Sequence, residues 1–242
     1  MLRFQLLLPS LDEQRCIVTR LNAVADRLSD RRNILKEQQT DLDALLYAAF
    51  ERITVDAPRL RMSDAAPLVR RPVEIDPESL YTEIGVRSFF RGIFHRRTVP
   101  GSEFTWQELF QIAEDDLVFS NLMAWEKGIG LAGTQDGGCV GNHRMLTCQP
   151  DTSRVVPKAL YFYFTTPSGF SHIEAGSPGS IARNKTLSPA ALQAIEVPVP
   201  SLDAQRWFDQ LHTKVTALRA HHAAISADCD TLLPAMLNDI FG

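Results

Sequence analysis

A seven-residue motif occurs twice in this chain, and each copy precedes about forty residues with a helical pattern. PSLDEQR at 9–15 returns as PSLDAQR at 200–206. At the fixed offset of 191, positions 9–50 and 200–241 share thirteen identities. Solenoid proteins repeat every ~20–50 residues, so this much longer spacing predicts two matched long helices on either side of one inserted domain.

The first helix is expected at 10–52, where neither Pro nor Gly interrupts the sequence. Ser10 followed by Glu13 has the pattern of a capping box. Apolar residues recur at spacings of three and four, as in a coiled-coil seam, at Ile17, Leu21, Val24, Leu28, Leu35, Leu42, Leu45 and Ala49. At 1.5 Å per residue, the helix would be about 60 Å long.

The second helix is expected at about 201–240, with Ser201 as its cap but Ala204 in place of the acidic residue. Its apolar stripe comprises Phe208, Leu211, Val215, Leu218, Ile225, Leu232 and Met236. Pro234 predicts a kink or a break near it. A long helix with a single apolar stripe needs a partner, so the two helices are expected to form an antiparallel coiled coil.

One row of the first stripe, 17-24-31-38-45, corresponds at the same offset to 208-215-222-229-236. The middle positions of both rows are weakly apolar or polar: Arg31, Gln38, His222 and Cys229. Solvent could enter the seam there, or these residues could fix the register of the helices, as polar seam residues can. The pattern leaves both interpretations open.

Residues 54–199 differ in kind, because eleven prolines and most of the glycines punctuate them. Short apolar runs predict strands at 81–86, 116–120, 129–132, 145–148 and 195–199, and short helices at 159–165 and 189–194. The expected fold class is α+β. The expected domains are 1–53, a strand remnant with the first helix; 54–199, a globular domain; and 200–242, the second helix.

Composition allows an ordinary globular protein but does not identify a partner. The net charge is −4 and 45% of residues are hydrophobic. Domains that bind nucleic acid are usually basic, but phosphates are contacted by local patches rather than by the total charge. No apolar run is long enough to span a bilayer, the start lacks a signal-peptide pattern, and four scattered cysteines do not suggest a disulfide framework. We therefore expect a cytoplasmic protein without a membrane association.

The sequence contains no recognisable catalytic motif. A phosphate-binding loop, a dinucleotide fingerprint, a nucleophile elbow and a zinc-protease motif are all missing. Cys139, His143 and Cys148 could suggest a metal site, but three candidate ligands without a fourth favour buried thiols and a polar turn. The acidic run 114–116 is interpreted as a solvated turn rather than an acid–base pair. No cofactor, metal or catalytic residue is therefore predicted.

Cationic residues cluster in one part of the middle region. Between 83 and 101 four arginines stand against Glu83 alone, a local charge of +3, with His95 and three phenylalanines among them. Such side chains suit contacts to phosphates and base edges, although solvated loops would look similar. The predicted DNA-contacting residues are Arg87, Arg91, Arg96, Arg97, Asn121, Lys127, Asn142, His143, Arg144, Arg183 and Lys185. Trp125 is interpreted as a packed residue rather than a base-stacking one.

These features together resemble the specificity (S) subunit of type I restriction-modification enzymes. Paired P-x-L-x-x-Q starts open the two long helices, and the region between them has the look of a target-recognition domain. The segments that carry the resemblance are YTEIG at 81–85, EDDLVFS at 114–120, AWEKG at 124–128, IARNKTLS at 181–188 and IEVPVP at 195–200. Their order and spacing extend the resemblance over essentially the whole chain.

The resemblance implies a non-catalytic subunit that reads double-stranded DNA and docks modification subunits through its helices. Methyl transfer with S-adenosylmethionine would belong to the modification subunits, and cleavage with ATP to the restriction subunit. The family usually has two recognition domains that read the halves of a split target, whereas this sequence contains one. It is therefore expected to be the C-terminal part of a split or shortened subunit, or an engineered fragment. The second recognition domain could come from a homodimer or from a separate N-terminal recognition domain.

A second interpretation comes from a different class of protein. The chain could be an interaction scaffold that does not bind DNA, a coiled coil with an inserted protein-binding domain, and the lack of a globally basic composition favours it. Salt-dependent DNA binding distinguishes the two.

Overall fold

The computed structural model describes residues 9–104, 108–179 and 185–241 of the chain. The chain divides into two compact units. One is helical and consists of Met1–Ala48 with Leu211–Gly242, and the other is the continuous segment Ala49–Gln210. The domain boundaries expected at 53/54 and 199/200 remain a proposal about how the chain is organised.

Both long helices form where the motif predicts them, α1 at Leu11–Thr54 and α6 at Leu202–Phe241. The capping box of α1 is present: the Ser10 amide donates to Glu13 Oε2 at 2.8 Å, and the Glu13 amide donates to Ser10 Oγ at 3.3 Å. The hydrogen bonds from Ser10 hold the pKa of the Glu13 carboxyl below its ordinary value. At the start of α6 the Ala204 amide donates to Ser201 Oγ at 3.3 Å, so the second copy has the cap without the box.

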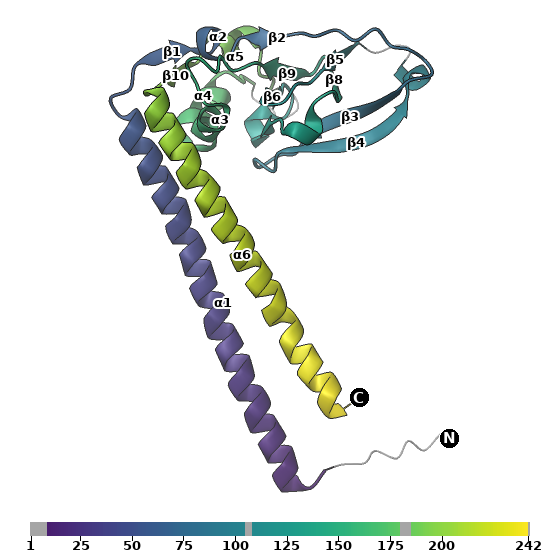
Figure 1. Ribbon diagram of the computed structural model, residues 1–242, viewed down its shortest axis with the longest axis vertical. Helices are drawn as coiled ribbons and strands as arrows, with labels where there is room; N and C mark the ends of the chain where they lie inside the picture. Colours follow the sequence, from purple (N-terminus) through teal and green to yellow (C-terminus); the bar gives the residue numbers. More distant parts are fainter. Residues whose placement is uncertain (1–8, 105–107, 180–184, 242) are drawn as a thin grey trace. The chain divides into compact units, whose positions relative to one another are not determined.

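The helical unit pairs α1 and α6 in opposite directions (Figure 1). Arg32 Nη2 lies 2.6 Å from Asp230 Oδ1, and Asp43 forms an ion pair with Arg219. From the first ion pair to the second, the residue number rises from Arg32 to Asp43 on α1 and falls by the same amount, from Asp230 to Arg219, on α6. The antiparallel arrangement of the two helices is confirmed. Within the described residues no helix has the length and apolar composition to cross a membrane.

One of the two rows of the apolar stripe on α1 holds throughout, with Leu21, Leu28, Leu35, Leu42 and Ala49 buried or half-buried, whereas the other row differs from the expected one. Leu45 is 47% exposed, whereas the adjacent Leu46 is 2% exposed. An α-helix has 3.6 residues per turn, so a strict seven-residue row drifts around the helix axis. The row through Ile17 and Val24 therefore gives way to Gln39 and Leu46, and the predicted continuation through Gln38 and Leu45 was wrong. On α6 the expected row holds at Val215 and Cys229, both of which are buried.

Of the kink or break expected near Pro234, the break does not occur, since α6 continues through this residue to Phe241. Proline removes one amide donor and crowds the carbonyl of the residue four positions earlier, which here is Asp230. The side chain of Asp230 is held by Arg32 of α1. Both side chains of this ion pair are more than half exposed, so the pair adds at most a small stabilisation at this turn.

The second unit is α+β, as expected, with two four-stranded sheets (Figure 1). The antiparallel sheet has the order β2 (Leu68–Val69), β9 (Met145–Cys148), β6 (Leu117–Ser120) and β7 (Ile129–Leu131). The mixed sheet has the order β4 (Ile93–Pro100), β3 (Leu80–Val86), β8 (Val140–Asn142) and β5 (Leu109–Gln111). A short pair joins β1 (Arg59–Arg61) to β10 (Glu196–Pro198). The five predicted strands correspond to β3, β6, β7, β9 and β10.

Short helices complete this unit: α2 (Met62–Ala65), α3 (Pro157–Thr165), α4 (Pro167–Ala175) and α5 (Pro189–Ala194), with 3-10 turns η1 (Gly101–Phe104), η2 (Ala124–Glu126) and η3 (Thr134–Asp136). The predicted helices correspond to α3 and α5, and Ser188 caps α5 by accepting from the Ala191 amide at 3.1 Å. Sequence reasoning missed α4, because Thr166 alone separates it from α3 and Pro167 looks like a break. Thr166 instead caps α4, accepting from the Gly169 amide at 3.1 Å.

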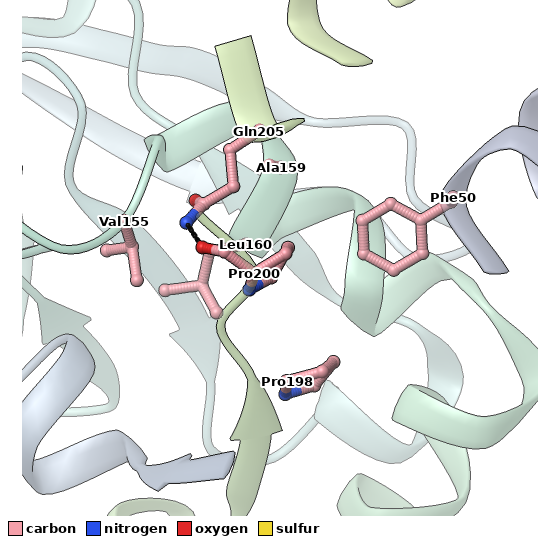
Figure 2. A pocket seen from close by; sticks show the side chains of 7 residues that line it. All are labelled: Phe50, Val155, Ala159, Leu160, Pro198, Pro200 and Gln205. Atoms are coloured by element: carbon pink, nitrogen blue, oxygen red, sulfur yellow. Dashed lines mark hydrogen bonds between the residues drawn. The ribbon is translucent and has the colours of Figure 1, made fainter. Parts of the chain in front are cut away.

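Gln205, the glutamine of the second motif, is buried within this unit at 2% exposure. Its Oε1 accepts from the Val156 amide at 2.7 Å, and its Nε2 donates to the carbonyls of Arg154 at 2.9 Å and Pro200 at 2.7 Å. Figure 2 shows Gln205 beside a small hollow whose volume is about 10 Å³. That is room for at most one water molecule, so the hollow is a small gap in the packing and not a ligand site.

Burial distinguishes the four cysteines and leads to a labelling prediction. Burial raises the pKa of the Cys148 thiol to about 12, while Cys16 is exposed on α1. Because the thiolate is the reactive form, iodoacetamide at neutral pH should alkylate Cys16 in the folded protein and Cys148 only after unfolding. Peptide mass spectrometry measures both. Rapid native labelling of Cys148 would contradict the packing around β9.

Candidate nucleic-acid interface

Two of the predicted arginines lie on a bulged hairpin rather than in a loop. Strands β3 and β4 pair antiparallel, with Glu83 opposite Arg97 and Ile84 opposite His95, so Arg96 is the extra residue of a bulge. Neighbouring strand residues normally point to opposite faces, but a bulge re-aims them. As a result Arg96 Nη1 reaches Glu83 Oε1 at 3.4 Å, and Arg97 Nε reaches Glu83 Oε2 at 3.1 Å.

The Glu83 carboxylate is buried beneath its two arginines. The Glu83 side chain is 4% exposed, whereas those of Arg96 and Arg97 are 57% and 42% exposed. Arg97 is also held by Glu103 at 3.1 Å and lies over the Phe104 ring at 5.1 Å. The buried Glu83 carboxylate therefore orients the two guanidinium groups, and their outer sides remain open to solvent.

A polar hollow of about 390 Å³ opens at this point, lined by Glu83, Arg96, Arg97 and Asn142. Arginine donors and an amide are groups that read base edges, those of guanine and adenine respectively, while the buried Glu83 carboxylate orients the arginines. Asn142 Oδ1 accepts from the Arg144 amide at 3.0 Å, which leaves its amide nitrogen to donate elsewhere. The hollow has the polarity of a recognition surface rather than of a pocket for an apolar ligand.

The turn between β8 and β9 carries the next group of predicted residues, His143 and Arg144, which are both exposed. Arg70 supports this turn by donating to the carbonyls of Met145 at 3.0 Å and His143 at 3.2 Å. The Asn121 amide donates to the Arg144 carbonyl at 2.9 Å, and the Asn121 carbonyl accepts from the Leu187 amide at 2.8 Å. Asn121 therefore positions two segments through its backbone.

Three further cations lie over aromatic rings at the tip of the β3–β4 hairpin. Arg87 lies over Phe94 at 4.7 Å and Arg91 over Phe89 at 5.6 Å. Lys127 Nζ lies 5.7 Å from the Phe90 ring and 5.5 Å from the Phe170 ring. Among the described residues, none of the three cations forms an ion pair. Such cations remain available to phosphates while cation–π contacts limit their motion.

Trp125 is half-buried, so its exposure lies between that of a packed core residue and that of a residue free to stack on a base. Its indole N–H donates to the Leu122 carbonyl at 2.8 Å, and Lys185 Nζ lies 5.2 Å from its ring. The ring therefore supports a cation and is not buried in the core. The predicted contact Arg183 lies outside the described residues.

Contacts connect most of the predicted residues into one set. The hollow shares Asn142 with the β8–β9 turn, the turn contacts Asn121, and Asn121 contacts the segment that carries Lys185. Lys185 lies over Trp125, which neighbours Lys127 on the loop that meets the hairpin tip. His95 is different, because its Nε2 lies 3.0 Å from Asp136 Oδ1 and its role is internal. Whether the connected set contacts DNA remains a prediction.

Two sequence interpretations concern chemistry other than DNA binding. No group of three potential metal ligands occurs among the described residues, and His143 is exposed while Cys148 is buried. In the acidic run at 114–116, Glu114 and Asp115 form the exposed turn that was expected, but Asp116 does not belong to it. Asp116 is 1% exposed and binds Arg71 through two contacts of 2.6 and 3.1 Å. Its partner lies 45 positions away, so no local pattern could show that burial.

Sequence reasoning missed two residues that shape the surface, Glu83 and Arg70. Glu83 looked like a single charge opposing four arginines, and Arg70 lay outside the cationic cluster. A hairpin interpretation of 80–100 would have paired Glu83 with the arginines, because alternating residues flank the Phe-Phe-Arg-Gly turn. No comparable local signal exists for Arg70, since its contacts are with residues over 70 positions away.

The order of elements in this chain, a domain of two sheets flanked in sequence by two long antiparallel helices, is also found in solved structures. A chain in a solved type I restriction-modification system, described for its assembly and conformational transition, matches with TM-score 0.65 and 20% identity, over 97% of this chain and 60% of that one. The HsdS subunit of Thermoanaerobacter tengcongensis matches with TM-score 0.57 and 19% identity, over 97% and 59%. The type I S subunit of M. genitalium matches with TM-score 0.51 and 11% identity, over 96% and 62%.

The chain therefore has the fold of type I specificity subunits, and the resemblance suggested by the repeated motif is confirmed at the level of the fold. It spans about three-fifths of the length of each of those structures. No protein-family model matches the chain, and no curated protein matches it.

Proposed function

We propose that this chain is a DNA-recognition subunit of a type I restriction-modification system. The unit Ala49–Gln210 reads part of a bipartite target in double-stranded DNA, and the helix pair docks the methyltransferase subunits. The observation that carries the proposal is the connected set of cations in a fold shared with known specificity subunits. Cations without carboxylate partners serve phosphates, while the hollow beside Arg96 and Asn142 serves base edges.

The chain acts without catalysis of its own. Methyl transfer belongs to the modification subunits and cleavage to the restriction subunit, and the assembly works on DNA in the cytoplasm. Phosphate contacts position the recognition domain, and base contacts specify the sequence. The net charge of −4 is compatible with this role, because the cations gather on one connected surface.

The motif repeat supports the docking of a second recognition domain on this chain. In the second copy, Gln205 binds the Pro200 carbonyl and two backbone groups of its domain. In the first copy, Gln14 Nε2 makes the equivalent bond to the Pro9 carbonyl at 2.8 Å, and the Gln14 side chain makes no further hydrogen bond among the described residues. The side-chain amide of Gln14 therefore has hydrogen-bonding capacity left that the amide of Gln205 uses to bind the backbone of its domain. We propose that a second recognition domain docks there, from another copy of this chain or from a separate chain.

A salt series with matched variants tests DNA binding. For duplexes of ~20–30 base pairs, affinity should fall steeply between about 50 and 200 mM salt. The substitutions Lys127→Gln and Lys185→Gln should each lower the slope of log affinity against log salt by about 0.9, because each removes one phosphate contact. The control is Arg154→Gln, an exposed cation that is paired with Asp151, and its slope should match the unchanged chain.

Fluorescence anisotropy measures the affinities, with the chain alone and with its modification subunits. Absent or salt-insensitive binding in both cases would sink the proposal and favour the scaffold interpretation. Equal slope changes for Arg154→Gln and the two lysine variants would show that the connected cationic set is not the contact surface.

A further inference from the structure

The tip of the β3–β4 hairpin has an unusual backbone. Phe89 and Phe90 have φ angles of +62° and +55°. A positive φ is uncommon for residues other than glycine, because a side chain is crowded in this conformation. Left-handed backbone costs an ordinary residue about 1–2 kcal/mol. Two consecutive phenylalanines in this conformation therefore call for a compensating role.

Specific hydrogen bonds hold this strained turn in place. The Phe89 amide donates to the Glu126 carbonyl and the Phe90 amide to the Lys127 carbonyl, each at 2.9 Å. The Arg87 amide donates to the Gly92 carbonyl at 2.9 Å and closes the turn. Lys127 itself has a φ of +64°. The tip is thus docked rigidly on the η2 loop, so the direction of the Phe89 side chain is set by the fold.

The two phenylalanines differ in how much their rings contribute to packing. The Phe90 ring packs edge-on against Phe170 at 5.7 Å between centroids, next to Lys127. The Phe89 side chain is 62% exposed, and the Arg91 guanidinium lies 5.6 Å from the centre of its ring. Packing therefore accounts for Phe90 but not for Phe89. Strain that packing does not offset is a recognised mark of a functional position.

The surroundings of Phe89 indicate which ligand its ring suits. Arg87, Arg91 and Lys127 bring three cations to the tip, and the nearby Glu126 carboxylate accepts from the Ser88 hydroxyl at 3.2 Å. A flat exposed ring among cations matches a polyanion whose bases offer flat faces. Apolar side chains inserted between base steps are a known device of DNA-bending proteins.

We propose that Phe89 is a stacking wedge, which inserts its ring against an unstacked base step of bound duplex DNA. The inference rests on the proposed function and adds to it a specific mode of contact. Arg87, Arg91 and Lys127 hold the phosphates on either side, while the rigid turn keeps the ring pointed at the bases. A protein partner with an apolar pocket for the ring is the competing occupant that the test must exclude.

The test compares variants of the full chain on mixed-sequence duplexes of ~20–30 base pairs, intact or with one abasic position, without modification subunits, because methyltransferases themselves extrude a base. Each duplex carries 2-aminopurine, whose fluorescence rises on unstacking. Because a wedge has less unstacking to do at an abasic position, the unchanged chain should prefer that duplex. Phe89→Ala should weaken binding about 5-fold to 100-fold and abolish both the preference and the fluorescence rise. Phe89→Trp should keep them.

Two further variants separate stacking from folding. Phe89→Gly relieves the positive φ, so it should fold at least as stably as the unchanged chain and yet bind as weakly as Phe89→Ala. Leu80→Ala, another apolar residue of the same unit with 69% exposure, should leave binding unchanged within about two-fold.

The outcomes distinguish this inference from the proposed function. If no form of the chain binds DNA, the proposed function itself fails. If binding and its salt dependence persist while Phe89→Ala equals the unchanged chain, the wedge is overturned and the proposed function stands. Loss of modification-subunit binding in Phe89→Ala, with DNA binding by the chain alone unaffected, would identify a protein pocket instead and also overturn the wedge.

Discussion

Replacing Gln205 with alanine should lower the free energy of unfolding by about 2–4 kcal/mol. The substitution leaves the Val156 amide and the carbonyls of Arg154 and Pro200 without the partners they have at 2.7–2.9 Å. Gln205 is 2% exposed, so water cannot readily replace the missing amide. Urea unfolding followed by circular dichroism measures the change.

The repeat supplies a matched control in Gln14→Ala. Gln14 occupies the same motif position and makes the same bond to the preceding proline carbonyl, but solvent reaches it. Its replacement should change the stability of the isolated chain by less than about 0.5 kcal/mol. It should instead weaken association with a second recognition domain, which light scattering measures as loss of the larger species. Equal destabilisation by both variants would contradict the difference in docking between the two copies.

Replacing Arg71 with methionine should destabilise the domain by about 3–5 kcal/mol, because it leaves a buried carboxylate without its counter-ion. The Asp116 side chain is 1% exposed and binds Arg71 at 2.6 and 3.1 Å, with a further bond from the Ala113 amide at 2.8 Å. Thermal and urea unfolding measure the loss. Asp116 directly precedes β6, the strand that leads to Asn121, so the variant should also weaken DNA binding.

Two comparisons make this prediction specific. The double variant Arg71→Met with Asp116→Asn should recover part of the lost stability, because no charge remains buried. Arg154→Met removes an exposed pair with Asp151 at 3.3 Å and should cost less than about 1 kcal/mol. If Arg71→Met is as mild as Arg154→Met, the buried pair contributes no more than a surface one.

The helices were predictable because their signals are local. Ser10 and Glu13 cap a helix from three positions apart, and the apolar spacing of three and four follows directly from helical geometry. The repeated motif predicted that the two ends would match, and it placed the glutamine at the same position in both copies. Most packed positions of α1 were predicted, but one row was not followed to its end, since whether Leu45 or Leu46 is buried depends on the drift of that row against the partner helix.

The candidate interface was predictable in composition but not in arrangement. The sequence showed which cations are abundant between 83 and 101, but it could not show that a bulge directs Arg96 and Arg97 to one buried glutamate. It grouped Phe89 with Phe90 as two aromatic neighbours. Their different burial depends on Phe170, which lies 80 positions further along the chain.

The sequence by itself determined the two capped helices, the inserted α+β domain and the resemblance to specificity subunits, because these follow from periodicity, capping and motif order along the chain. The tertiary structure alone decided which of the two motif glutamines anchors a domain, which arginines are paired and which aromatic ring remains exposed. The physical reason is that hydrogen bonds, ion pairs and burial depend on groups brought together from distant positions. Gln14 and Gln205 are identical residues in nearly identical motifs, and only their surroundings distinguish them.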